Sequence, residues 1–225
     1  EATLDVLRAL VEAFGSTVVL STATQPAFDD TPYIKAFQGL GVTEIVPQYL
    51  KHFATLRRVR YEVRREPLTW QAVAEEVLAL RQVMVVLNSR KDALALVRLL
   101  GPGHEVFHLS TLLCGAHRRK VLADVTGRLR RDQPIRLCAT QVVEAGVNLD
   151  FPVVWRAIGP LDRIVQAAGR CNREGKLPDN GLVVIFEPAE GRAPSGPYKA
   201  GIEEARLLLA RNEAERLHEP HLYRD

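Results

Sequence analysis

The sequence predicts a doubly wound α/β domain, in which helices cover both faces of a parallel β-sheet. From Arg57 onwards, short apolar runs alternate with helical segments, and this alternation favours parallel strands joined by crossover helices. The runs contain few polar residues, as expected for strands that are buried on both faces. Polar motifs follow directly after several runs, where ligands of open parallel sheets bind. We therefore expect a functional site at the carboxyl edge of the sheet.

The individual elements of this domain follow from the same patterns. We expect strands at residues 59–63, 83–87, 106–109, 135–139, 153–158 and 182–186. We expect helices at residues 70–80, 91–100, 116–129 and 162–169, and a charged amphipathic helix at 201–217. A stretch rich in glycine and proline, residues 191–197, precedes that last helix and is expected to be flexible.

The N-terminal part has a different pattern. An amphipathic helix at about residues 4–14 precedes a short apolar run, 17–20, which predicts a buried strand. Residues 29–56 are irregular, with several glycines and prolines, and predict a linker. We divide the chain into residues 1–47, the end of a first domain with its linker, 48–190, the α/β domain, and 191–225, a flexible stretch and helix.

The composition is that of a globular protein. Of 225 residues, 47% are hydrophobic and 25% are charged, and the net charge is +3. No apolar run reaches the ~18 residues of a membrane span. The first residues lack an initiating Met and the basic region of a signal peptide, so we expect a piece from the middle of a longer protein. Three widely spaced cysteines favour a reducing compartment over a disulfide framework or a zinc site.

The most specific motif is the segment QAAGRCNR, residues 166–173. On a helix, Gln166, Arg170 and Arg173 would share one face. Two guanidinium groups that point the same way suit a polyphosphate or its transition state, because each is a planar fork of permanently charged donors. The alternative interpretation is a pair of ordinary surface arginines on a helix.

A second motif follows the predicted strand 83–87 and consists of Asn88, Ser89 and Arg90. Ser89 is expected to cap the next helix. The same helix N-terminus, together with Arg90, would also hold a backbone phosphate of a nucleic acid. Capping and phosphate binding are compatible, so both are expected here.

A third motif follows the predicted strand 106–109. Ser110 and Thr111 come first, and the next helix opens with His117, Arg118 and further cationic residues. Hydroxyls and cations in this order predict a surface that tracks phosphates. A solvated basic helix face is the alternative. His104 lies four residues before His108, but it belongs to a Gly-Pro-Gly-His turn, so we expect no metal site.

A fourth motif, residues 139–150, reads ATQVVEAGVNLD. The strand before it would deliver Thr140 and Gln141 to the sheet edge, where a hydroxyl and nearby amides can hold a phosphate. Gly146 permits a close approach of the backbone to a ligand. Asn148 would face a nucleotide ribose.

Together these segments resemble the CRISPR-associated helicase–nuclease of type I interference systems, a superfamily 2 helicase. The resemblance covers roughly residues 1–187 and rests on residues 22–26, 108–111 with His117 and Arg118, 141–147, and 160–162 running into 166–173. It implies a RecA-like parallel sheet, helicase lobe two, preceded by the end of lobe one. Most members of the family carry Asp where this chain has Asn148, so the ribose contact lacks the usual charge.

The resemblance also implies roles for these residues. Gln166, Arg170 and Arg173 would be catalytic, and both arginines would bind ATP together with Gly146 and Asn148. Ser21, Thr22 and Thr24 would couple the state of ATP to lobe movement, although a plain Ser/Thr turn is the alternative. The implied nucleic-acid track consists of Asn88, Ser89, Arg90, Ser110, Thr111, His117, Arg118, Thr140 and Gln141.

The resemblance further implies ATP with Mg2+ as cofactor and single-stranded DNA as substrate. The partners would be a first helicase lobe and a nuclease domain of the same protein, and an RNA-guided surveillance complex in a prokaryotic cytoplasm. The sequence contains no G-x-x-x-x-G-K-[ST] phosphate loop, so the missing first lobe would hold the magnesium and the phosphates. We therefore expect this chain to be inactive alone, although it would belong to an ATP-dependent translocase. The alternatives are a non-catalytic nucleic-acid-binding lobe and a lobe of another superfamily 2 DNA or RNA helicase.

Overall fold

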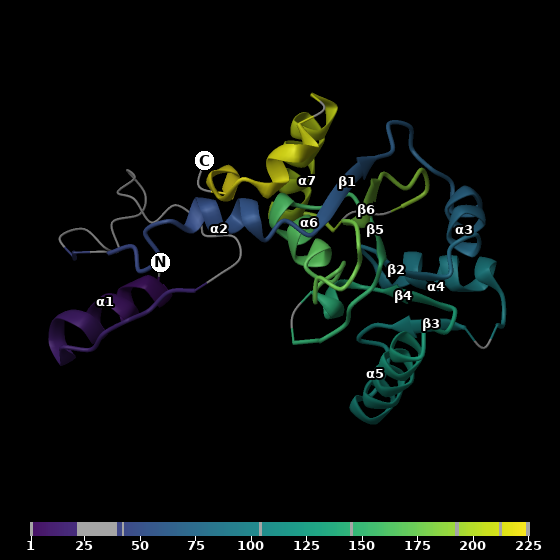
Figure 1. The fold of residues 1–225 in the computed structure, drawn as a ribbon, viewed down its shortest axis with the longest axis horizontal. Coiled ribbons are helices and arrows are strands. Elements are labelled where there is room, and N and C mark those ends of the chain that lie inside the picture. The colour runs from purple at the N-terminus through teal and green to yellow at the C-terminus, as the bar shows by residue number, and fades with distance from the viewer. Residues whose placement is uncertain are drawn as a thin grey trace. The chain divides into compact units, whose positions relative to one another are not determined.

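The computed structural model describes residues 2–21, 40–41, 43–103, 105–144, 146–191, 194–211 and 213–223. The chain divides into two compact units, Glu1–Leu56 with His218–Asp225, and Arg57–Leu217. The predicted coupling residues Thr22 and Thr24 lie outside the described residues, as does His104. Figure 1 shows the path of the chain.

In its described residues, the first unit contains the helices α1 (Ala2–Phe14) and α2 (Tyr49–Thr55) and the 3-10 turn η3 (Pro220–Tyr223). Helix α1 confirms the predicted N-terminal helix. Helix α2 lies within the segment predicted to be irregular, so that prediction is wrong for its last part. The rings of Tyr49 and Phe53, one turn apart, meet edge to face at 6.5 Å between centroids, a local contact that stabilises this short helix.

The strand predicted at residues 17–20 is absent from the described part of this unit, where these residues form no regular structure. Val19 is 64% exposed and Leu20 is 40% exposed. A β-strand needs a neighbouring strand for its main-chain hydrogen bonds, and the described residues of this unit supply none. The prediction of a buried strand before Ser21, which is itself exposed, is therefore wrong.

The second unit is built on one six-stranded sheet with the order β1-β6-β5-β2-β4-β3. Every neighbouring pair is parallel, as predicted from the alternation of strands and helices. The strands are β1 (Val59–Val63), β2 (Gln82–Val86), β3 (Val106–Leu109), β4 (Ile135–Ala139), β5 (Val153–Ala157) and β6 (Gly181–Phe186). Each predicted strand of the domain exists, and the bounds differ by at most one residue at either end.

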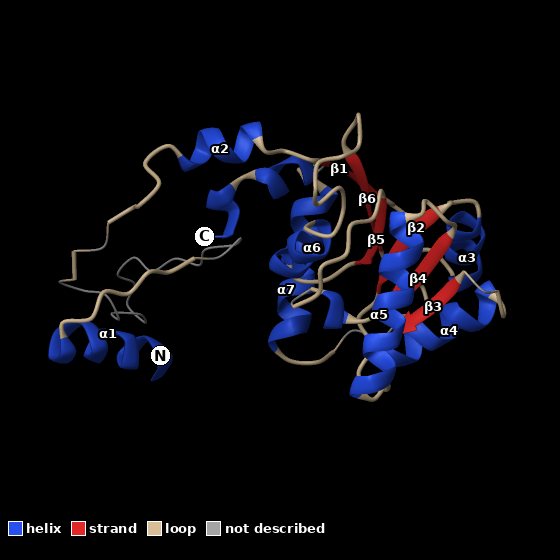
Figure 2. Cartoon of the chain, turned by 60° about the horizontal axis from the view of Figure 1, so that its bottom comes forward, coloured by secondary structure: helices blue, strands red, loops and turns tan. Residues whose placement is uncertain are grey.

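Helices cover both faces of the sheet, as Figures 1 and 2 show. Those of the second unit are α3 (Trp70–Leu78), α4 (Arg90–Leu100), α5 (Gly115–Arg130), α6 (Leu161–Ala168) and α7 (Pro197–Ala210), with the 3-10 turns η1 (Gln141–Val143) and η2 (Ala214–His218). Helix α7 begins before the predicted residue 201 because Pro197 suits the first helical position. It ends at Ala210, and η2 takes the place of its predicted last turns.

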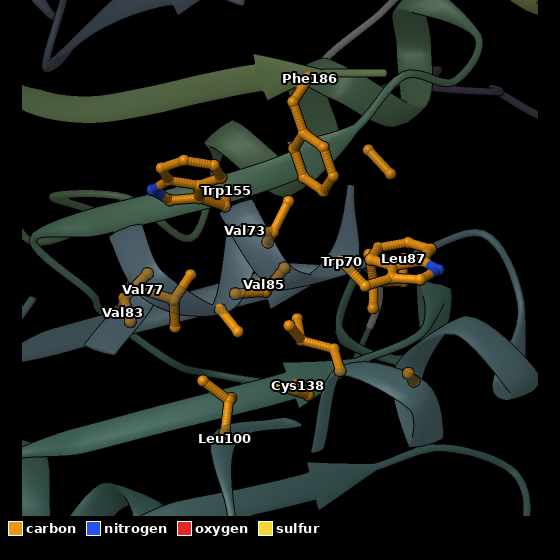
Figure 3. Packing of buried hydrophobic residues seen from close by; sticks show 14 of the residues in the cluster. Trp70, Val73, Val77, Val83, Val85, Leu87, Leu100, Cys138, Trp155 and Phe186 are labelled. Carbon is orange, nitrogen blue, oxygen red and sulfur yellow. The ribbon is translucent and has the colours of Figure 1, made fainter. Parts of the chain in front are cut away.

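A core cluster lies between one sheet face and helices α3 and α4. Val73 from α3 is fully buried there together with Val85, Cys138 and Trp155 from the strands (Figure 3). Leu96 from α4 belongs to the same cluster and is also fully buried. Because strand side chains alternate, the residues between these point to the opposite face, and Met84, Leu137 and Val154 are also fully buried. Helix α5 contacts β3 and β4, and α6 contacts β5 and α7. Burial on both faces explains why the strands read as continuous apolar runs.

Candidate functional site

All strands of the second unit run in one direction, so their carboxyl ends meet at one edge of the sheet. Three of the predicted motifs begin there, after β2, β3 and β4. The motif at residues 166–173 differs: it follows α6, and its parallel bridge between Phe151 and Cys171 lies just before the first residue of β5, at the amino end of that strand. The expected convergence at the carboxyl edge is therefore present for three motifs and absent for this one.

The motif after β2 is partly internal. Ser89 is the N-cap of α4 and accepts a hydrogen bond from the Asp92 N–H at 3.1 Å, as predicted. Arg90 is exposed. The Asn88 side chain is 9% exposed, and its Nδ2 donates to the Ile158 carbonyl at 2.7 Å. Asn88 therefore points into the domain, whereas Ser89 and Arg90 border solvent.

The motif after β3 contains a similar division. Ser110 is fully buried, and its hydroxyl accepts from the Leu112 N–H at 3.2 Å. Thr111, His117 and Arg118 are exposed. The first turn of α5 and the loop after β4 enclose a depression of about 240 Å³, which is lined by Leu109, Gly115, Arg118, Arg119, Leu122, Val142 and Val147. The depression combines aliphatic walls with two guanidinium groups.

The motif after β4 turns sharply at the sheet edge. Thr140 is buried and Gln141 is half-buried at the start of η1. Gly146 has φ +69°, and nothing lies within 4 Å of the position that a Cβ would occupy. Asn148 is exposed. Gly146 and Asn148 thus leave an open backbone surface that a ligand can approach closely.

Arg170 and Arg173 do not share a helix face. Helix α6 ends at Ala168, after which the Phe151 N–H donates to the Arg170 carbonyl at 2.9 Å and the Asn172 N–H donates to the Phe151 carbonyl at 2.9 Å. These bonds draw the chain out of the helix, and Asn172 adopts φ +45°. The predicted helical alignment of Gln166, Arg170 and Arg173 is therefore wrong, because tertiary pairing ends the helix early.

The two arginines have opposite surroundings. Arg170 is 8% exposed, and its guanidinium donates to the carbonyls of Val143 at 2.8 Å and Glu144 at 2.7 Å. Arg173 is exposed. The Asp150 carboxylate holds its backbone by accepting from the Arg173 N–H at 2.7 Å and the Glu174 N–H at 3.3 Å. Arg173 therefore presents its charge from an anchored turn.

Gln166 lies near the end of α6 and is half-buried. Its Nε2 donates to Asp162 at 3.5 Å, and its Oε1 accepts from Arg163 at 3.4 Å. Both distances are long, so these bonds are weak. The side chain amide of Gln166 is therefore held loosely in comparison with the guanidinium of Arg170.

A buried ion pair beneath these motifs escaped the sequence analysis. Arg156 in β5 is 0% exposed, and its guanidinium lies 3.3 Å from the carboxylate of Glu144, whose side chain is 1% exposed. Arg163 lies 3.3 Å from the same carboxylate. An arginine within the apolar strand run VVWRA was the available signal, because a charge buried on a sheet face needs a partner.

Burial changes the acidity of several groups at this edge. It raises the pKa of Glu144, although the charges of Arg156 and Arg163 oppose the shift. Burial, and secondarily the charge of Arg173, lowers the pKa of Arg170. The pKa of His108 is lowered by burial and by the nearby His117. The ends of β3 and β4 thus form a partly desolvated environment.

In the described ranges, no three His, Cys, Asp or Glu side chains gather closely enough to hold a metal ion. None of the helices described has the length and apolar character needed to span a bilayer.

Comparison with known proteins identifies related sequences and folds. The family model of CRISPR-associated nuclease/helicase Cas3, C-terminal, matches residues 79–176. The chain is 46% identical over 87 residues to the CRISPR-associated nuclease/helicase Cas3 of Haloferax volcanii. This alignment covers 36% of this chain and 9% of that protein. It is 25% identical over 134 residues to the protein of the same name from Methanothermobacter thermautotrophicus. That alignment covers 58% of this chain and 16% of the relative. The chain thus spans a small part of either relative.

Solved structures share the fold. The crystal structure of T. fusca Cas3-AMPPNP aligns with a TM-score of 0.59 and 19% identity, over 85% of this chain and 25% of that chain. A CRISPR RNA-guided surveillance complex, pre-nicking, contains a chain that aligns with a TM-score of 0.54 and 19% identity, over 73% of this chain and 25% of that chain. The family model and the relatives thus show that part of this chain is similar to the C-terminal part of CRISPR-associated nuclease/helicase Cas3, and the solved structures show that it shares their RecA-like fold.

Proposed function

We propose that this chain is the second RecA-like lobe of an ATP-dependent single-stranded DNA translocase that acts in CRISPR interference. The observation that carries the proposal is the gathering of exposed Arg90, Thr111 and Arg118 at the carboxyl edge of a parallel sheet, in a chain of which residues 79–176 match the Cas3 C-terminal model. Cations and hydroxyls at such an edge suit phosphate groups.

For nucleotide binding, the turn that carries Arg173 and the loop that carries Gly146 fit an ATP molecule that a first lobe presents. Arg173 is exposed on a turn held by Asp150, and the backbone at Gly146 is open. ATP would supply the phosphoryl group that is transferred to water. Arg173 would stabilise its developing negative charge, an effect worth ~10³-fold or more in related ATPases. Arg170 would hold the Val143 and Glu144 carbonyls, and thereby the loop beside the nucleotide.

The remaining components of the proposal belong to the longer protein. We assign Mg2+ and the phosphate cradle to the first lobe, because this sequence has no phosphate loop. The coupling role of Ser21, Thr22 and Thr24, the nuclease domain and the surveillance complex are proposed on the family match. One similar structure includes AMPPNP and another is a surveillance complex, which supports the proposed cofactor and partner.

For DNA binding, we propose a track that contacts phosphates through Ser89, Arg90, Thr111, His117 and Arg118. Asn88, Ser110 and Thr140 are buried, so we assign them to the support of this surface. Gln141 is half-buried, so its exposure is intermediate between that of the exposed contact residues and that of the buried supporting residues. Contacts to the DNA phosphate backbone would tolerate any base sequence, and the affinity would fall as the salt concentration rises.

ATP hydrolysis by the purified chain, with and without single-stranded DNA, tests the proposal. We expect no turnover by the chain alone, and turnover after a separately produced first lobe is added. Arg173→Ala should then abolish the restored activity while DNA binding remains. Turnover by the chain alone, above that of Arg173→Ala, would show that the nucleotide is held without a first lobe and would contradict the proposal.

The second candidate function is a nucleic-acid-binding lobe without catalysis. The lack of a phosphate loop favours it for the chain in isolation. The anchored, exposed Arg173 favours the catalytic lobe, because its turn lies at the amino end of β5, away from the strand ends that carry the proposed DNA track. Failure of a first lobe to restore turnover, with DNA binding intact, would select the binding lobe.

A further inference from the structure

Tyr198 lies in the first turn of α7, and its hydroxyl joins three other segments of the domain. It donates to Asn88 Oδ1 at 2.8 Å and accepts from Arg156 Nη2 at 2.9 Å. Gln141 Nε2 lies 3.5 Å away. A phenolic hydroxyl has one proton to donate and lone pairs to accept, so a single atom contacts a side chain of β5 and side chains from the loops after β2 and β4.

The partners of this hydroxyl belong to the proposed DNA track and its support. Asn88 immediately precedes Ser89 and Arg90, and Gln141 opens the turn η1. The two segments also contact each other directly, because Gln141 Nε2 donates to the Asn88 carbonyl at 3.3 Å. Tyr198 thus lies where the loops after β2 and β4 meet.

The buried arginine completes the arrangement. Arg156 Nη1 donates to Asn88 Oδ1 at 2.8 Å, and its guanidinium pairs with Glu144. Gly159 leaves the necessary room, because a Cβ there would lie 2.8 Å from Arg156 Nη2 and 3.1 Å from the Tyr198 hydroxyl. Arg156 Nε and Glu144 Oε1 have no hydrogen-bond partner among the described residues, but the bonds that Asn88 and Tyr198 make with Arg156 give the loop a defined position.

We infer that Tyr198 is a positioning residue for single-stranded DNA, through which helix α7 sets the relative placement of the loops at Asn88 and Gln141. The inference rests on the proposed function, because it concerns the same track. Without the hydroxyl, Asn88 Oδ1 loses a donor and Arg156 an acceptor, so the two loops lose a shared anchor.

Helix α7 has a second attachment that offers a matched control. Arg206 forms an ion pair with Glu187, just after β6, and its Nε donates to Glu187 at 3.2 Å. This pair docks the same helix and contacts none of the track residues. A purely structural role for α7 predicts that loss of either attachment has the same kind of effect.

The experiment compares Tyr198→Phe and Arg206→Gln in the full 225-residue chain. Affinity for a fluorescently labelled oligo-dT strand is measured by anisotropy across a salt series, and the thermal midpoint is measured in parallel. We expect Tyr198→Phe to weaken binding ~5-fold, the loss of about one hydrogen bond, with an unchanged salt slope because no charge is removed. Arg206→Gln should bind as the unmodified chain does.

Other outcomes separate the two proposals. The positioning role is refuted if Tyr198→Phe binds DNA as tightly as the unmodified chain does, or if Tyr198→Phe and Arg206→Gln lose the same affinity for DNA. Either result leaves the proposed DNA track unaffected. If the unmodified chain fails to bind oligo-dT at low salt, both the proposed DNA track and the positioning role of Tyr198 are refuted. Gly159→Ala disturbs the same network from another element and should also weaken binding, so it replaces Tyr198→Phe if that variant does not fold.

Discussion

Arg170 and Arg173 are three residues apart, yet the first is buried against main-chain carbonyls and the second is exposed on a turn. The difference arises because α6 ends at Ala168 and the chain then pairs with Phe151. One arginine therefore stabilises the loop after β4, and the other is free to meet a ligand. Substitution at the two positions separates these roles.

Arg170→Gln should destabilise the chain by about 1–3 kcal/mol, because two buried carbonyls lose charged donors. Arg173→Ala is the matched control and should change the free energy of unfolding by about 0.5 kcal/mol or less, as an exposed substitution. Urea unfolding followed by circular dichroism measures both. Equal effects on stability would contradict the different environments of the two side chains.

Glu144→Ala should be among the most damaging substitutions in the domain. It leaves the guanidinium of Arg156, which is 0% exposed, without its counter-ion, and breaking a buried pair costs about 3–5 kcal/mol. Glu187→Gln removes the partner of Arg206 at a more exposed pair and should cost about 1 kcal/mol or less. Chemical denaturation of both variants is the measurement, and a comparable loss in the two would refute the prediction.

His108 should make stability depend on pH. Its pKa in the folded chain is lowered from 6.5 by burial and by His117, so the unfolded chain binds more protons between the lowered value and 6.5. The free energy of unfolding therefore increases as the pH rises through that window and decreases as the pH falls through it. His108→Asn should flatten this part of the profile, measured by urea unfolding at a series of pH values. An unchanged slope in the variant would assign the dependence to other groups.

Arg118→Ala should reduce the salt dependence of single-stranded DNA binding. Loss of one phosphate contact is expected to lower the slope of log K against log salt by about 0.7. Arg131, the exposed C-cap of the same helix α5, lies at the opposite end from the track, so Arg131→Ala should leave the slope unchanged. Equal slopes for the two variants would mean that the helix acts as a uniform basic surface.

Gly115→Leu should fill the depression between α5 and the loop after β4 without removing charge. Gly115 lines the depression, and a Cβ there would meet only Arg119 Nη1, at 3.7 Å, so the fold should tolerate the change. We expect weaker DNA binding with the salt slope retained, because aliphatic and guanidinium walls suit an unstacked base. Unchanged affinity would show that the strand passes outside the depression.

The inner strands were predictable because they are buried on both faces and read as short apolar runs. Residues 135–139 form a strand with the predicted bounds and are buried throughout. The outer strands 59–63 and 106–109 also have the predicted bounds, although they are only partly buried. The same criterion failed at residues 17–20, where an apolar run has no strand beside it in the described part of its unit. An apolar run predicts burial. A strand also needs a neighbouring strand for its main-chain hydrogen bonds, and the local sequence does not show whether one is present.

The sequence by itself determined the fold class, the resemblance to a helicase family and the three motifs that meet at the carboxyl edge of the sheet, because periodicity and motif spacing are local properties. Only the tertiary structure decided where side chains point within those segments. Pairing with Phe151 moved Arg173 off the helix, and packing buried Asn88, Ser110 and Thr140. Contacts between residues far apart in sequence, such as Tyr198 with Asn88, arise from the docking of whole elements and leave no periodic trace in either segment.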